Sequence, residues 1–172
     1  FYQPYITAEN YVDSRTSMKN LGYWSKPFIL EDFYKDNHKM ITYSAPLVYD
    51  KTVYGVLGIE VGVNDLTKFF QVKDLDSDLN AGFALVVDHG NGNYEGIAGE
   101  GALYDAVSRD GSDFVLEEPV QENLRLVQGA AIGKQQIYGL VSNLELYSRN
   151  VPYEDTQWAL CGFVTEDSVY GL

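Results

Sequence analysis

Acidic side chains alternate in the run DLDSDLN, which begins at Asp74 and ends at Asn80. An EF-hand loop begins to surround calcium with this alternation, but it also needs glycine at its sixth position and a bidentate glutamate at its twelfth. Counting from Asp74 places Leu79 and Leu85 at those two positions, and counting from Asp76 fails in the same way. We therefore predict a solvated loop here and no metal site.

The other residue types that catalyse reactions or hold cofactors are scattered. His38 and His89 are far apart in the sequence, and the single cysteine, Cys161, lies in the apolar run WALCGFV, where we predict a buried thiol. The glycine-rich run HGNGNYEGIAGEG lacks the Gly-Lys-Ser/Thr ending of a phosphate-binding loop, and no Gly-x-Ser-x-Gly elbow occurs. We therefore expect no enzyme activity, no cofactor and no metal ion.

Composition narrows the classes of partner. The chain has 172 residues, a formal net charge of −13 and 45% apolar residues, so it can bury a core while repelling phosphate backbones and anionic lipid surfaces. We expect no nucleic-acid partner. Tyrosine is unusually frequent, with 14 residues, and its flat apolar ring with a polar tip suits half-buried sheets and pockets.

In the first half of the chain, the sequence predicts mainly strands, and these would position any binding site there. In MITYSAPLVYD, apolar residues occupy alternate positions from Ile41 to Leu47, which predicts a half-buried strand, and Pro46 places it at an edge or a bulge. After the turn YDKT, the run VYGVLGIEVGV predicts an antiparallel hairpin partner. A weak helix is expected in YITAENYVDSRTSMKN before a turn at Gly22, and a helix capped by Asn64 in NDLTKFF.

A boundary between two domains is expected near residue 75, in the polar stretch VKDLDSDLNAG. Beyond it, GFALVVDHGNGNYEGIAGEG predicts a strand, a turn and a second strand, and GALYDAVSRDG predicts a short helix that ends at Gly111. FVLEEP, KQQIYGLVSNLELYS and TQWALCGFVTED predict three more strands, whose connections are too short for a parallel crossover. The predicted fold class is therefore α+β with antiparallel sheets, in two domains of residues 1–75 and 76–172.

Two stretches resemble the double Cache sensor domains of bacterial transmembrane receptors. GYWSKPF followed by MITYSAPLVYDKTVYGVLGIEVGVNDL is similar to the closing half of their membrane-distal PAS-like module, and LYSRNVPYEDTQWALCGF resembles the last strands of the membrane-proximal module. The resemblance covers most of the chain. It implies two PAS-like modules, the first lacking its N-terminal half, outside the cytoplasm and anchored to the cell membrane by segments beyond this chain.

The same resemblance implies the ligand-binding residues. Amino-acid-binding members hold the ligand with an Arg-x-Trp-Tyr element, a turn tyrosine and a strand aspartate. Tyr2 matches the first of these elements, whose arginine would precede Phe1, while Phe28 replaces the turn tyrosine and Glu60 replaces the aspartate. These two departures leave an α-amino-acid ligand open. Glu60 would pair with a cationic group that the aromatic rings enclose, and the predicted ligand-binding residues are Tyr2, Tyr23, Trp24, Phe28, Tyr43 and Glu60.

The predicted function is small-molecule sensing, with a pocket between the sheet and the loop from Gly22 to Ile29. The ligand would be an amino acid, an amine or a small carboxylate. The partners implied are a cytoplasmic output domain of the same polypeptide, such as a histidine kinase, diguanylate cyclase or chemotaxis output, and a second copy in a homodimer. Two alternatives stay open: a secreted binding or adhesion module without signalling output, and a hydrolase that uses carboxylates such as Glu60 and Asp65. Core packing is at least as good an interpretation as ligand contact for Trp24 and Phe28, and a ring placed like that of Tyr43 more often belongs to a core than to a pocket.

Overall fold

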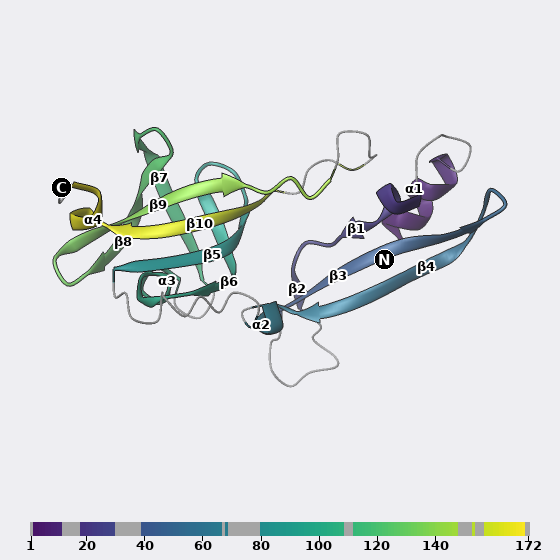
Figure 1. Cartoon of the computed structure of the whole chain (residues 1–172), viewed down its shortest axis with the longest axis horizontal. Helices are drawn as coiled ribbons and strands as arrows, with labels where there is room; N and C mark the ends of the chain where they lie inside the picture. The colour runs from purple at the N-terminus through teal and green to yellow at the C-terminus, as the bar shows by residue number, and fades with distance from the viewer. Residues whose placement is uncertain are drawn as a thin grey trace. The chain divides into compact units, whose positions relative to one another are not determined.

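The chain forms two compact units in the computed structural model (Figure 1). The structure describes residues 2–11, 18–29, 39–66, 68, 80–108, 112–147, 153 and 157–170. Unit 1 comprises Phe1–Asp65 and Glu145–Thr156, and unit 2 comprises Leu66–Leu144 and Gln157–Leu172. The boundary predicted near residue 75 lies outside the described residues. The return of Glu145–Thr156 to unit 1 was not predicted.

A long antiparallel hairpin is the main feature of unit 1. Strand β3 (Lys39–Tyr49) pairs with β4 (Thr52–Gly62), which confirms the hairpin predicted from the alternating pattern. The pairing shifts between Leu47 and Val48, next to Pro46, as expected for a proline beside a bulge. The turn itself uses two residues with positive φ, Asp50 and Lys51.

Short elements complete unit 1. Helix α1 (Gln3–Tyr11) packs against β3 and β4 and buries Pro4, Thr7 and Ala8 (Figure 1). A 3₁₀ turn (Met18–Leu21) leads into β1 (Tyr23–Trp24), and β1 and β2 (Phe28–Ile29) pair with β3. Helix α2 (Val63–Leu66) begins before Asn64, so Asn64 lies within the helix and the predicted cap is wrong.

Unit 2 is an antiparallel barrel. Within the described residues six strands close on themselves in the order β10-β5-β6-β7-β8-β9. The strands are β5 (Ala81–Asp88), β6 (Asn93–Glu100), β7 (Asp113–Gln121), β8 (Leu124–Ile132), β9 (Gln135–Asn143) and β10 (Trp158–Thr165). Helix α3 (Ala102–Val107) follows β6 and helix α4 (Glu166–Tyr170) follows β10. Strand β8 was missed by the sequence analysis. The mostly antiparallel architecture with a few helices agrees with the predicted class.

The barrel core holds aromatic and small side chains. Phe163 contacts both Phe114 and Tyr104, with ring centroids 5.5 and 6.3 Å apart, respectively. Cys161 is fully buried beside them, as predicted, and burial raises the pKa of its thiol to about 12. A barrel interior filled by buried side chains of this kind leaves ligand binding to the ends of the strands.

Candidate functional site

The predicted binding residues of unit 1 lie on both faces of its sheet. Residues directly opposite each other in an antiparallel pair share a face. The register pairs Tyr43 with Trp24 and with Ile59, so these three side chains share one face. The rings of Trp24 and Tyr43 are in contact, with centroids 4.9 Å apart.

Glu60 lies on the opposite face. It is paired with Thr42, whereas Tyr23 is paired with Ser44 and Phe28 with Met40, two positions to either side along β3. Glu60 is exposed, and the hydroxyl of Thr42 is buried without a hydrogen-bond partner among the described residues. The structure therefore does not bring Glu60 and Tyr43 into one cage, and ligand contact by these residues stays a prediction.

Tyr2 is the outlier of the predicted set. Its side chain is 80% exposed, at the start of helix α1. An exposed ring of this kind gains little from enclosing a cation, because cation–π attraction is weakest where water competes.

Two tyrosines that the sequence analysis did not select complete an aromatic cluster in unit 1. Tyr147 and Tyr153 belong to the returning segment, and their rings contact Tyr23 with centroids 6.4 and 5.1 Å away. The hydroxyl of Tyr147 accepts a hydrogen bond of 2.8 Å from the backbone N–H of Trp24, and the hydroxyl of Tyr153 donates one of 2.8 Å to the carbonyl of Leu21. Burial raises the pKa of Tyr147 to about 12. These hydroxyls are already paired within the protein.

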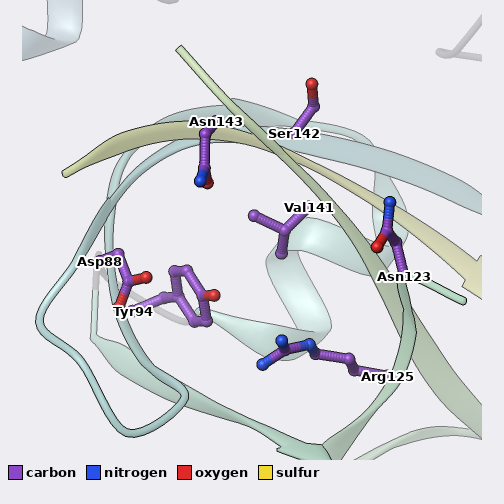
Figure 2. A pocket seen from close by; sticks show the side chains of 7 residues that line it. All are labelled: Asp88, Tyr94, Asn123, Arg125, Val141, Ser142 and Asn143. Atoms are coloured by element: carbon purple, nitrogen blue, oxygen red, sulfur yellow. The ribbon is translucent and has the colours of Figure 1, made fainter. Parts of the chain in front are cut away.

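Unit 2 carries a polar cavity of about 440 Å³, which we call the Arg125 cavity. Its lining comes from the ends of β5, β6, β8 and β9 and from the turn before β8: Asp88, Tyr94, Asn123, Arg125, Val141, Ser142 and Asn143. Figure 2 shows the side chains of Asp88, Tyr94, Arg125 and Asn143 reaching into a common space, while the hydroxyl of Ser142 points away from it. A second cavity of about 430 Å³ shares Asp88, Tyr94 and Arg125 and adds Glu117 and Glu118 of β7.

Charges of both signs meet in this cavity. Asp88 and Tyr94 are paired across β5 and β6, and Oδ1 of Asp88 accepts a hydrogen bond of 2.7 Å from the N–H of Gly90. Burial raises the pKa of Tyr94, the Asp88 carboxylate raises it further, and the Arg125 guanidinium opposes both. Asp88, Tyr94 and Arg125 line the same cavity, which therefore offers both a cation and an anion to a solute.

The turn between β5 and β6 holds Asp88 in place. Gly92 has a φ of +75°, and a Cβ atom there would lie 2.3 Å from the carbonyl oxygen of Leu116. The N–H of Leu116 donates a hydrogen bond of 2.8 Å to the carbonyl of Gly92. Only glycine fits this close approach of the turn to β7. The predicted hairpin turn is confirmed, and its exposed His89 pairs with Glu95 at 3.0 Å.

The described residues also bear on metal sites and on membrane-spanning helices. No group of three metal-ligating side chains comes together among them, and residues 74–79 of the acidic run lie outside this set. In the same part of the chain, no helix has both the length and the apolar character needed to cross a membrane.

Sequence comparisons found no relatives: no family model matches the chain, and no curated protein matches it significantly.

Solved structures do match. The ligand-binding domain of the Pseudomonas fluorescens chemoreceptor CtaA in complex with L-isoleucine is similar over 98% of this chain, with a TM-score of 0.51 and 14% identity. The complex of the same domain with L-alanine matches 87% of this chain, with a TM-score of 0.50 and 12% identity. The chain spans 59% and 56% of those two structures. Both structures are of the ligand-binding domain of a bacterial chemoreceptor, and the chain shares its fold.

Proposed function

We propose that this chain is the extracytoplasmic ligand-sensing domain of a bacterial transmembrane signalling protein. The observation that carries the proposal is the fold shared with chemoreceptor ligand-binding domains over almost the whole chain. Fold alone does not fix function. The proposal therefore also rests on the cavity with mixed charges in unit 2 and on the Cache-like motifs of unit 1.

The sensing role requires no catalysis. The domain binds a small molecule such as an amino acid, an amine or a small carboxylate, and its two units, a sheet and a closed barrel, correspond to the two PAS-like modules of the resemblance. Binding biases the receptor by the difference in ligand affinity between its signalling states. The output domain, a kinase, a cyclase or a chemotaxis module, and any dimer partner belong to the full receptor.

The contacts proposed in unit 1 now divide into two sets. Tyr23, Phe28 and Glu60 share one sheet face with Thr42, whose hydroxyl has no hydrogen-bond partner in the part of the chain that the structure describes. Trp24 and Tyr43 occupy the other face, and Tyr2 lies exposed at the start of α1. A cationic ligand group on Glu60 would be bound on the first face, where the Thr42 hydroxyl could also find a partner.

A thermal-shift screen tests the proposal. Amino acids, amines and small carboxylates are added to the full chain, and a ligand at about 100 times its dissociation constant should raise the unfolding free energy by about 2.7 kcal/mol. Glu60→Gln should remove the shift that a purely cationic ligand gives, while Glu145→Gln, an exposed carboxylate of unit 1, should keep it. Absence of any shift across all three classes would contradict the proposed function, and turnover lost in Glu60→Gln would favour a hydrolase.

A further inference from the structure

Arg125 brings a cationic group that is rich in hydrogen-bond donors to the Arg125 cavity. Its guanidinium carries five N–H donors in a planar fork that matches a carboxylate. Arg125 is half-buried, and within the described residues it forms no ion pair. A partly desolvated charge of this kind is stabilised by an anion that the cavity can admit.

The acidic groups around Arg125 restrict which anion fits. Asp88 lines both cavities, and Glu117 and Glu118 line the second. Three carboxylates near one guanidinium repel a dianion, and the net charge of −13 adds to that repulsion. A solute that carries an ammonium group together with its carboxylate can instead be attracted to both Arg125 and Asp88.

The positions of the polar side chains agree with a solute of mixed charge. Figure 2 shows the Asp88 carboxylate on one side of the cavity and the Arg125 guanidinium on another, with the Tyr94 ring between them and the Asn143 amide and the Val141 side chain facing the same space from the opposite side. A volume of about 440 Å³ lies within the range of ligand pockets in proteins. An amide next to an apolar side chain can orient a small polar solute while contacting its carbon atoms.

We propose that the Arg125 cavity binds a small zwitterion, with the carboxylate of the ligand on the Arg125 guanidinium and its ammonium group on Asp88. This inference rests on the proposed function, because it names the ligand class and a location in unit 2 for the same sensing role. The site is separate from the residues proposed in unit 1.

An NMR titration of the ¹⁵N-labelled full chain tests the inference. L-Alanine, β-alanine and γ-aminobutyrate place the two charges progressively further apart, while propionate and ethylamine each carry one of them. At least one zwitterion should shift the amides of Gly90 and Asn143 and the Nε–H signal of Arg125 in a saturable way. Propionate and ethylamine should bind at least about tenfold more weakly, because each loses one charge-assisted contact.

Matched variants locate the binding. Arg125→Gln should lower the affinity for the zwitterion by at least about tenfold. Lys134→Gln, which removes the same charge from the exposed β8–β9 turn, should leave this affinity unchanged. Asp88→Asn should also lower the affinity for the zwitterion. Its amide oxygen can still accept the hydrogen bond from the Gly90 N–H, so the turn should be kept. The ¹H–¹⁵N spectrum of each variant verifies folding.

Three results would overturn the inference. If a zwitterion binds with equal affinity to Arg125→Gln, or shifts only signals of unit 1 such as Trp24, the Arg125 cavity is not its site and the proposed function still stands. If none of the three zwitterions binds, the ligand class is wrong, and the wider thermal-shift screen then decides the proposed function separately.

Discussion

The aromatic cluster of unit 1 and the Arg125 cavity of unit 2 use their polar groups differently. In the cluster, the hydroxyls of Tyr147 and Tyr153 are hydrogen-bonded to backbone atoms of the same unit. In the cavity, the guanidinium of Arg125 has no ion-pair partner within the described residues. Rings alone therefore do not identify a binding site, since they also pack a core. A charged side chain that lines a cavity without such an ion pair does point to a binding site.

The largest expected effect concerns the barrel that carries the cavity. Cys161 is fully buried, and its pKa is raised from 9.0 to about 12, so the native barrel should hold about a thousandfold less thiolate than an exposed cysteine. Reaction of the thiol with a disulfide reagent should be slower by at least this factor in the native chain than in urea. Equal rates would show that the barrel opens readily, and the contrast between a packed barrel core and a polar cavity at its end would fail.

A core substitution should destabilise unit 2 selectively. Phe163→Ala removes a ring that is 1% exposed and should lower the unfolding free energy of the barrel by about 3–5 kcal/mol. Each unit contains one of the two tryptophans, Trp24 in unit 1 and Trp158 in unit 2, so a Trp24→Phe background reports the barrel by fluorescence during urea unfolding.

Leu160→Ala on the same strand is the control for Phe163→Ala. Because Leu160 is 37% exposed, this substitution should lower the unfolding free energy much less. Equal losses of unfolding free energy in the two variants would contradict the assignment of Phe163 to the barrel core.

The smallest effect is a pH dependence of unit 1. The folded-state pKa of Tyr147 is raised from 10.0 to about 12, so the folded state keeps a proton that the unfolded state releases. The unfolding free energy should be independent of this group below the ordinary pKa and should fall as the pH rises from about 10 to about 12. A Trp158→Phe background follows unit 1 by the fluorescence of Trp24.

Tyr147→Phe should make this alkaline decline shallower without abolishing it, because burial also raises the pKa of Tyr153. An unchanged slope in Tyr147→Phe would mean that Tyr147 is not held in the cluster. Tyr54→Phe is the matched control, since Tyr54 is 68% exposed on β4 and its loss should leave the slope as it is.

The sequence predicted the elements whose apolar residues alternate. The β3–β4 hairpin was predicted because its pattern repeats every second residue, and the β5–β6 turn because of its glycines and asparagines. Strand β8 was missed because its buried residues Leu124 and Val127 are three positions apart and its pairing with β9 shifts between Leu126 and Ala131. Missing β8 also meant missing Arg125.

Contacts between distant segments were the other limit on prediction from the sequence. Tyr147 and Tyr153 reach unit 1 only because the chain returns after β9, and nothing local in LYSRNVPYED indicates that return. The resemblance predicted the mostly antiparallel architecture shared with chemoreceptor ligand-binding domains, but it selected binding residues by their position in a motif. The turn residues Gly90 and Gly92, which hold Asp88, and the turn QENL before β8 were the signals that could have led to the cavity.

A crystal structure of the full chain grown with the zwitterion that stabilises it most would test the central claim directly. The account predicts ligand density in the Arg125 cavity, with both carboxylate oxygens in hydrogen-bond contact with the Arg125 guanidinium and the ammonium group next to Asp88. Density confined to unit 1, or a cavity that holds only water while the ligand is bound elsewhere, would contradict it.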